Sequence, residues 1–165
     1  MEPHNLFLWG DSAGGGLALR ALLARRDAGL SPLGGAVLGS PWVALRSNAR
    51  SLTENGAYDY LGPAILEQWA DWVGSEAGEL DQCLVDRDLS GLPRLRLLVG
   101  GLECFRDDIH QLHTRAREAG VDVALLEAPL GVHCWYMVPG MPGREDPLRD
   151  LASWLEGSTA AATTL

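Results

Sequence analysis

The sequence predicts a single α/β domain built around a parallel sheet. Three observations support this class: short apolar runs alternate with helical patterns, glycine or proline closes most of these segments, and the first run, helix and second run fit within about forty residues. A strand–helix–strand unit of this length is a βαβ unit, whose strands are parallel and whose crossover is right-handed. We assign residues 1–156 to this domain and residues 157–165 to a flexible tail of low complexity.

The first half of the chain supplies two strands and two helices. Residues 5–9 form a short apolar run, which predicts a strand that is buried on both faces, as parallel strands are. An alanine- and leucine-rich helical pattern covers residues 13–28, and residues 34–39 form the second strand. A polar excursion over residues 43–62 follows, and the next helix begins near Pro63, since proline suits the first helical position.

The second half repeats this alternation. Residues 74–93 contain several glycines and are expected to form a loop before the third strand at 95–99. A helix over residues 107–119 and a fourth strand over 121–126 come next, and Asp146 begins the last helix. The element order predicts a three-layer domain with about four mostly parallel strands flanked by helices.

Composition and charge exclude several classes of function. Apolar residues make up 47% of the chain and charged residues 21%, as in soluble globular proteins, and the net charge of −9 argues against nucleic acid or an anionic membrane as a partner. The three cysteines are widely spaced without a CxxC pattern, which indicates free thiols in a reducing compartment. Residues 1–5 lack the features of a signal peptide, and no apolar run approaches the ~20 residues that span a bilayer, so a cytoplasmic location is expected.

Neither a metal nor a cofactor is expected. His110 and His113 have a spacing that can hold a metal on a helix, but no carboxylate or cysteine pattern completes such a site. The run Gly14-Gly15-Gly16 lacks the lysine and hydroxyl residue of a phosphate-binding loop.

A Gly-x-Ser-x-Gly motif links the first strand to the first helix. Its members are Gly10, Ser12 and Gly14, a pattern typical of a nucleophile elbow. Small residues on both sides of the serine let the strand and the helix pass closely, and the serine hydroxyl is presented at a helix N-terminus that favours developing negative charge. The alternative interpretation of Ser12 is an ordinary helix N-cap.

Two further loops supply a base and an acid for this serine. Glu103 follows the third strand and His133 follows the fourth, and in parallel sheets such loops meet beyond the carboxyl ends of the strands. The chain order serine, acid, histidine is that of the α/β-hydrolase arrangement. We predict Ser12 as the nucleophile, His133 as the base and Glu103 as the acid, with Asp107 as the alternative acid.

Several segments resemble the hormone-sensitive-lipase-like branch of α/β hydrolases. The elbow at residues 10–15 is similar to that family's GDSAGG motif, residues 100–108 resemble its acid segment, and Ser40-Pro41-Trp42 resembles the segment after its next strand. The family mostly has Asp where Glu103 stands, and His-Gly-aromatic where this chain has His133-Cys134-Trp135. The resemblance covers nearly all of residues 5–156 and implies a serine carboxylesterase that forms an acyl-serine on short acyl esters.

The resemblance also implies parts that the sequence does not contain. Family members carry an upstream His-Gly-Gly-Gly segment that supplies most of the oxyanion hole, together with earlier strands and a cap, so the chain resembles the C-terminal half of an esterase. The amide of Ala13 is then the remaining predicted oxyanion donor. The first strand is expected to be an exposed edge showing Leu6 and Leu8. The alternative function is a non-catalytic remnant that needs a second copy or a partner chain to cover this edge.

Overall fold

The computed structural model describes residues 2–74 and 83–162, and it contains one four-stranded parallel sheet with the strand order β1-β2-β3-β4. The strands are β1 (Phe7–Asp11), β2 (Gly35–Gly39), β3 (Leu95–Gly100) and β4 (Val123–Ala128). All three neighbouring pairs are parallel. The predicted class, a partial α/β-hydrolase fold, is confirmed.

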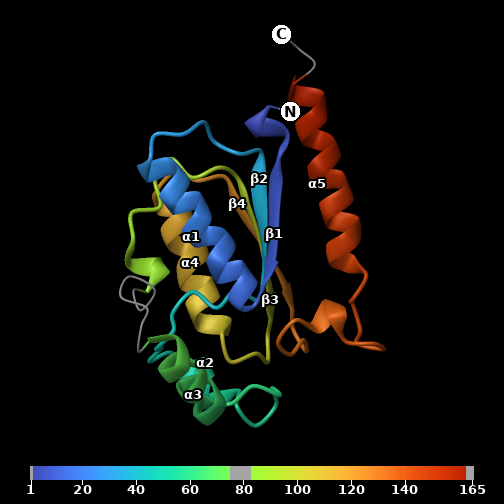
Figure 1. Ribbon diagram of the computed structural model, residues 1–165. Coiled ribbons are helices and arrows are strands. Elements are labelled where there is room, and N and C mark those ends of the chain that lie inside the picture. The colour runs from blue at the N-terminus through green and yellow to red at the C-terminus, as the bar shows by residue number, and fades with distance from the viewer. Residues whose placement is uncertain (1, 75–82, 163–165) are drawn as a thin grey trace.

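Helices cover both faces of the sheet (Figure 1). The helices are α1 (Ala13–Asp27), α2 (Arg50–Glu54), α3 (Pro63–Gly74), α4 (Arg106–Glu118) and α5 (Asp146–Ala162), with short 3-10 turns at Pro3–Asn5, Leu84–Asp86 and Trp135–Met137. Helices α1 and α4 lie on one face and α5 lies on the other, whereas α2 and α3 lie near the carboxyl ends of the strands. The candidate loops therefore open at the end of the sheet where α2 and α3 lie.

Alternate residues of the central strands build two separate apolar layers. Leu38 of β2 and Leu97 of β3 are register partners and belong to the larger core, which includes buried side chains of α1 and α4. Val37 and Leu98 point to the other face and form a smaller core with Leu151 of α5. This alternation follows from the two-residue period of a strand, so β2 and β3 contribute side chains to both layers.

The first strand differs from its prediction. It covers Phe7–Asp11 and is not buried on both faces: Trp9 is 48% exposed and Leu6 42%. Leu8 instead packs against the larger core, so the exposed edge shows Leu6 and Trp9 rather than Leu6 and Leu8. The physical reason is that β1 ends the sheet, while α5 packs over β2 and β3 through Leu151 and leaves β1 partly uncovered.

Two predicted loop regions and the predicted tail also differ in detail. The excursion over 43–62 contains the short helix α2, and the predicted loop at 74–93 falls partly on 75–82, which lie outside the described residues. Helix α5 continues past residue 157 to Ala162, while 163–165 lie outside the described residues.

In the described part of the chain, no helix is both long and apolar enough to cross a membrane.

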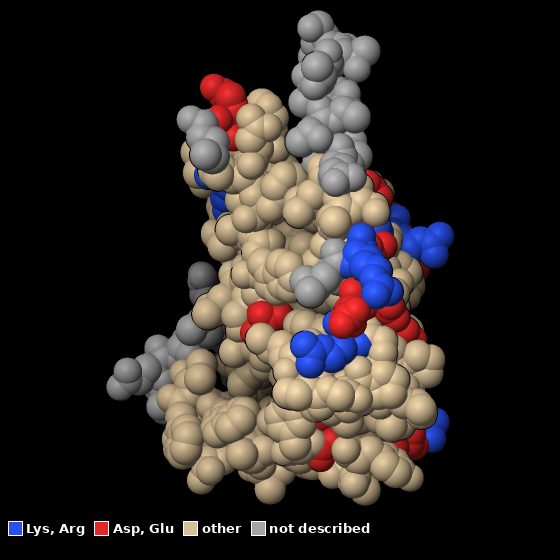
Figure 2. Space-filling model, turned by 90° about the vertical axis from the view of Figure 1, so that its right-hand side faces the viewer, with Lys and Arg blue, Asp and Glu red and all other residues tan. Residues whose placement is uncertain are grey.

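Charged side chains of opposite sign lie next to one another on the face seen in Figure 2. Ion pairs of α5 are of this kind: Arg149 lies 3.0 Å from Glu145, and Arg96 of β3 lies 2.8 Å from Asp150. The exposed Arg149–Glu145 pair contributes only about 0–1 kcal/mol. The Arg96–Asp150 pair is partly buried and connects α5 to β3, in addition to the apolar contacts of Leu151.

Candidate functional site

Ser12 sits in a strained turn between β1 and α1. Its backbone angles, φ 55° and ψ −122°, lie outside the regions that L-residues favour, at a cost of about 1–3 kcal/mol. Two backbone hydrogen bonds hold the turn: Ser12 N donates to Gly39 O at 2.8 Å, and Trp42 N donates to Ser12 O at 2.9 Å. The Ser12 side chain makes no capping hydrogen bond, so its hydroxyl is not used as an ordinary N-cap.

Glycines make this turn sterically feasible. A Cβ on Gly10 would lie 2.2 Å from Gly14 O, and a Cβ on Gly15 would lie 2.8 Å from Pro41 Cβ. Both distances are below any normal contact, so the strand, the helix and the loop after β2 can approach only where side chains are absent. This packing is the physical reason for Gly10 and Gly15, whereas a Cβ on Gly14, the other glycine of the motif, would meet no neighbouring atom of the described residues within 4 Å.

Ala13 is the first residue of α1, and its N–H donates to no other described residue. The first N–H groups of a helix have no intrahelical partner and carry the positive end of the dipole. The Ala13 amide is thus available to an oxyanion beside Ser12. Its catalytic role stays a prediction.

Glu103 is completely buried in the loop after β3. Its Oε2 accepts hydrogen bonds from Ser40 Oγ at 2.7 Å and Gly100 N at 2.9 Å, whereas Oε1 is buried without a partner among the described residues. Burial raises the pKa of Glu103 to about 8; the two hydrogen bonds oppose this shift, and the nearby Asp59 and Glu127 add to it. Glu103 is thus an acid that ionises in the mildly alkaline range.

His133 is 3% exposed in the loop after β4, and its Nδ1 is buried without a partner among the described residues. The rings of Phe105 and Tyr60 pack edge-on against the imidazole at centroid distances of 5.2 and 5.8 Å. Burial lowers the pKa of His133 to about 4, although the negative charges of Asp59 and Asp11 act in the opposite direction. The imidazole is therefore neutral, the form that a general base requires.

The structure places the three predicted catalytic residues at the same end of the sheet but does not join them directly. Among the described residues, no hydrogen bond connects Ser12, Glu103 and His133 to one another. The acid and histidine loops are connected instead by Asp59, whose carboxylate accepts from Cys104 N at 2.8 Å and from His133 N at 3.2 Å. The catalytic roles of the three residues stay predictions.

A second contact ties the histidine loop to the elbow strand. The Tyr136 hydroxyl donates to Asp11 Oδ1, which also accepts from Trp9 Nε1 at 3.0 Å. Gly39 leaves the space for this contact, since a Cβ there would lie 1.9 Å from the Tyr136 hydroxyl. Asp11, the residue directly before Ser12, is thus joined by Tyr136 to the 3-10 turn that follows His133.

Asp107, the alternative acid, is engaged elsewhere. Its carboxylate accepts from Ser51 N at 3.0 Å and lies 3.5 Å from Arg106. Its side chain is 39% exposed, in contrast to the fully buried Glu103. The geometry therefore favours Glu103 over Asp107 as the group that could orient His133.

Sequence reasoning did not identify Ser40, Asp59 or Tyr136 as site residues. Ser40 had a usable signal, because it directly follows the second strand at the edge where the candidate loops meet. Asp59 lies in a polar excursion and Tyr136 in an irregular loop, where no periodicity or motif marks them. Only the folded chain brings them to the loops that carry Glu103 and His133.

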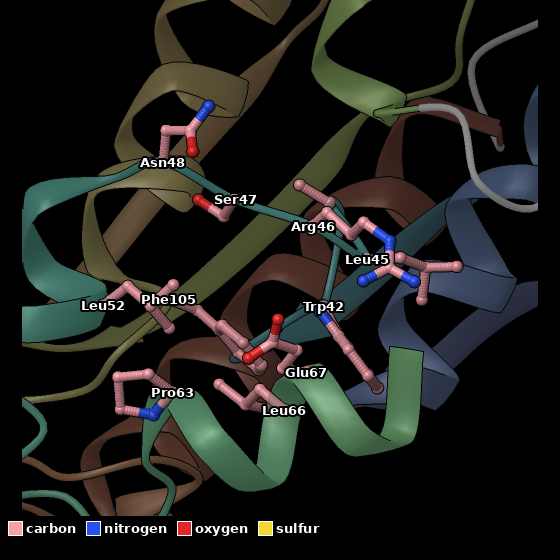
Figure 3. Close-up of a pocket in the computed structure, with 11 residues that line it drawn as sticks. Trp42, Leu45, Arg46, Ser47, Asn48, Leu52, Pro63, Leu66, Glu67 and Phe105 are labelled. Atoms are coloured by element: carbon pink, nitrogen blue, oxygen red, sulfur yellow. The ribbon is translucent and has the colours of Figure 1, made fainter. Parts of the chain in front are cut away.

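A cavity of about 290 Å³ lies beside this site. Figure 3 shows its lining side chains, which come from the loop after β2, from α2 and α3, and from the start of α4: Trp42, Ala44, Leu45, Arg46, Ser47, Asn48, Leu52, Pro63, Leu66, Glu67 and Phe105. The rings of Trp42 and Phe105 stack at 5.9 Å and form one wall. The cavity therefore shares Trp42 with the turn at Ser12 and Phe105 with the surroundings of His133.

The described residues contain no group of three His, Cys, Asp or Glu side chains that could hold a metal ion. His110 of α4 lies next to a carboxylate of β4, with its Nε2 3.0 Å from Glu127 Oε2. The chemistry of this end of the sheet is that of a serine, a buried carboxyl group and a neutral imidazole.

Parallel strands with a strained serine turn and candidate acid and histidine loops at their carboxyl ends define an α/β hydrolase. A family model described as alpha/beta hydrolase fold matches residues 1–137. The chain belongs to this family, in its hormone-sensitive-lipase-like branch.

Individual relatives agree with this assignment. An acetyl-hydrolase of Streptomyces hygroscopicus is 37% identical over 137 residues, which cover 81% of this chain and 46% of the relative. The carboxylesterase NlhH of Mycobacterium tuberculosis is 27% identical over 139 residues, covering 80% of this chain and 44% of its own length. The chain thus spans about half the length of the curated relatives that it matches.

Solved structures show the same extent of similarity. The crystal structure of an esterase from the bacterial hormone-sensitive lipase family superposes with a TM-score of 0.87 and 32% identity, covering 95% of this chain and 54% of that one. The hormone-sensitive lipase from a metagenome library superposes with a TM-score of 0.83, again at 32% identity. Almost the whole chain therefore has a counterpart in about half of each of these folds.

Proposed function

We propose that this chain carries the catalytic residues of a serine carboxylesterase that acts on short acyl esters. The observation that supports this most is the juxtaposition at one end of the sheet of a strained Ser12 with a free hydroxyl, a neutral buried His133 and a buried Glu103. Membership of the hydrolase family and the names of the relatives, an acetyl-hydrolase and a carboxylesterase, agree with this chemistry.

In the proposed reaction, Ser12 Oγ attacks the ester carbonyl carbon while His133 accepts the hydroxyl proton. Glu103 faces the imidazolium charge that forms, and the Ala13 N–H donates to the oxyanion. The alcohol leaves with the proton from His133, which yields an acyl-serine. A water molecule, deprotonated by His133, then attacks the acyl carbon and releases the carboxylic acid, and Ser12 recovers its proton.

The cavity beside Trp42 and Phe105 is proposed to receive the acyl group. Its lining is largely apolar, and the two aromatic residues of its wall contact the surroundings of Ser12 and His133: Trp42 N donates to Ser12 O, and the Phe105 ring packs against His133. A volume of about 290 Å³ is sufficient for an acyl group, and the proposed preference for short chains is tested by comparing esters of different length.

A fluorophosphonate probe together with p-nitrophenyl esters tests the proposed function. The chain is expected to become covalently labelled by the probe and to hydrolyse p-nitrophenyl acetate and butyrate faster than longer esters. Absence of both labelling and hydrolysis in a folded preparation, as judged by circular dichroism, would contradict the proposal.

Leu52→Trp is expected to reduce butyrate hydrolysis more than acetate hydrolysis. Leu52 lines the cavity from α2 and is only partly buried, so a larger ring can fill the cavity without replacing a core residue. Each methylene excluded from an apolar pocket corresponds to about 0.8 kcal/mol, or about fourfold in kcat/KM. The ratio of kcat/KM values for the two esters is the measurement. Leu33→Trp, at a partly buried leucine distant from this cavity, is the control, and an unchanged ratio in Leu52→Trp would exclude the cavity.

The exposed edge of β1 favours a second candidate, a binding role without catalysis. Within the described residues β1 pairs only with β2, and Trp9 is 48% exposed on this edge. A second copy would present the same edge, and antiparallel pairing of the two β1 strands around a two-fold axis would satisfy both rows of backbone groups. We propose a second copy as the occupant.

Trp9→Lys is expected to shift a dimer to monomers, because a lysine on a strand edge opposes pairing. Light scattering coupled to size-exclusion chromatography measures the mass. Trp72→Lys is the matched control, since Trp72 is also an exposed tryptophan, 68% accessible, but lies on α3 and not on the strand edge. A wild-type chain that is monomeric at every concentration would contradict pairing between copies.

A further inference from the structure

Ser40 occupies a strained and fully buried position directly after β2. Its side chain is 0% exposed, and its φ of 41° lies in the left-handed region that residues other than glycine rarely adopt. The backbone is held there by a hydrogen bond from Ser40 N to Leu98 O at 2.9 Å. Residues kept in such conformations cluster at functional sites, where the surrounding structure compensates their cost.

The Ser40 hydroxyl connects the side chain of Glu103 to the histidine loop. Its Oγ donates to Glu103 Oε2 at 2.7 Å and accepts from Cys134 N at 3.0 Å. Cys134 directly follows His133 and is itself left-handed, with a φ of 50°. Because the Cys134 N–H can only donate, the single hydroxyl hydrogen of Ser40 remains for the carboxyl oxygen of Glu103.

This bridge differs from the one that Asp59 makes. Asp59 binds two backbone N–H groups, those of Cys104 and His133, and therefore joins the loops without touching the carboxyl group of Glu103. Ser40 contacts that carboxyl group itself. Among side chains of the described residues, Ser40 is the one that donates a hydrogen bond to the Glu103 carboxyl group, whose other donor is the backbone N–H of Gly100. Asn55 donates only to the backbone carbonyl of Glu103.

We propose that Ser40 is a positioning residue, whose hydroxyl fixes the Glu103 carboxylate relative to the backbone that carries His133. This inference rests on the acyl-serine function proposed above. Glu103 is long enough to adopt several rotamers, so a hydrogen bond from a rigid, strained residue restricts it to one. The bond also stabilises the carboxylate against the negative charges of Asp59 and Glu127, which act on Glu103 from two other segments.

Two substitutions of Ser40 separate the hydroxyl from the backbone strain. Ser40→Ala removes the hydroxyl and keeps the strain, whereas Ser40→Gly removes the hydroxyl and tolerates the positive φ. Ser51→Ala is the matched control. Ser51 is also buried, and its hydroxyl donates to Cys104 O at 2.8 Å and accepts from Asp107 N at 3.1 Å, but it has no hydrogen bond to Ser12, Glu103 or His133.

Both Ser40 variants are expected to lower kcat by roughly 10- to 100-fold with KM little changed, the range for losing one hydrogen bond to a charged group. They should also raise the pKa of Glu103, since a hydrogen bond that favours the carboxylate is lost. Titration of the Glu103 carboxyl carbon by NMR, assigned with Glu103→Gln, measures this shift without any need for turnover. Ser51→Ala should leave both quantities unchanged.

A Glu103 titration in Ser40→Gly that matches the wild type, together with an unchanged kcat, would overturn the proposal. Equal effects in Ser51→Ala would overturn it too, because the hydroxyl of Ser40 would then act only through general packing. If the folded wild-type chain shows neither labelling by the fluorophosphonate nor ester hydrolysis, the proposed function fails. The titration alone then decides whether Ser40 holds the Glu103 carboxylate.

Discussion

Ser12→Ala is expected to abolish fluorophosphonate labelling and to lower ester hydrolysis by a factor of about 10⁴ to 10⁶. The hydroxyl of Ser12 is the attacking group in the proposed reaction, and it makes no structural hydrogen bond that another residue would need. Labelling of the purified chain, read by intact mass, is the measurement. Equal labelling of the wild type and the variant would remove Ser12 from the mechanism.

Substitutions of Ser12 are expected to remove activity without lowering the stability of the fold. Alanine retains the unfavourable φ of 55°, so Ser12→Ala should unfold at nearly the same temperature as the wild type. Ser12→Gly relieves the strain and is expected to stabilise the chain by about 1 kcal/mol while remaining inactive. Thermal unfolding of the two variants separates the loss of the nucleophile from a loss of fold. A Ser12→Gly variant less stable than Ser12→Ala would show that the turn is not strained.

Glu103→Gln is expected to lower kcat/KM by about 10³- to 10⁴-fold at pH 9, because a neutral amide does not stabilise the imidazolium of His133. Burial places the pKa of Glu103 at about 8 and that of His133 at about 4. In the wild type, kcat/KM should thus rise with pH through about 8 as Glu103 ionises, while His133 is neutral throughout. A pH profile from 6 to 10, corrected for spontaneous hydrolysis, is the measurement.

The contribution of Glu103 to the free energy of unfolding should fall with rising pH, whereas kcat/KM rises. The folded chain holds the Glu103 proton more tightly than the unfolded chain, so this group contributes stability that is fully present below its ordinary pKa of 4.5 and is lost as pH rises through about 8. Glutamine carries no charge at any pH. The unfolding temperature of Glu103→Gln relative to wild type should therefore increase between pH 5 and pH 9.

One result would reassign the acid. If Glu103→Gln retains the alkaline rise in kcat/KM, another carboxylate must orient His133. Asp107→Asn and Asp59→Asn then distinguish the remaining carboxylates near these loops. Asp107 is bound to Ser51 N and Arg106, whereas Asp59 contacts the backbone of His133.

The local pattern of the chain was sufficient to predict the elements that carry the candidate residues. The strand at 95–99, the helix beginning near Pro63 and the helix after Glu103 all form close to their predicted bounds. Periodicity identifies them because each buries one face against the same core. Residues 5–9 were the exception: their apolar pattern predicted burial on both faces, whereas the strand lies at the edge of the sheet, a position that the family resemblance indicated and the apolar pattern did not.

The sequence by itself determined the chemistry that is available: a serine between glycines, an acid and a histidine, each directly after a strand of a parallel sheet. This was predictable because parallel strands bring their carboxyl ends to one edge, whatever lies between them in the chain. The tertiary structure decided how these groups are held. Ser40 and Asp59 reach the acid and histidine loops across large separations in sequence, and burial moves the pKa values of Glu103 and His133. Such long-range contacts and desolvation depend on the packed fold, so no local pattern could have specified them.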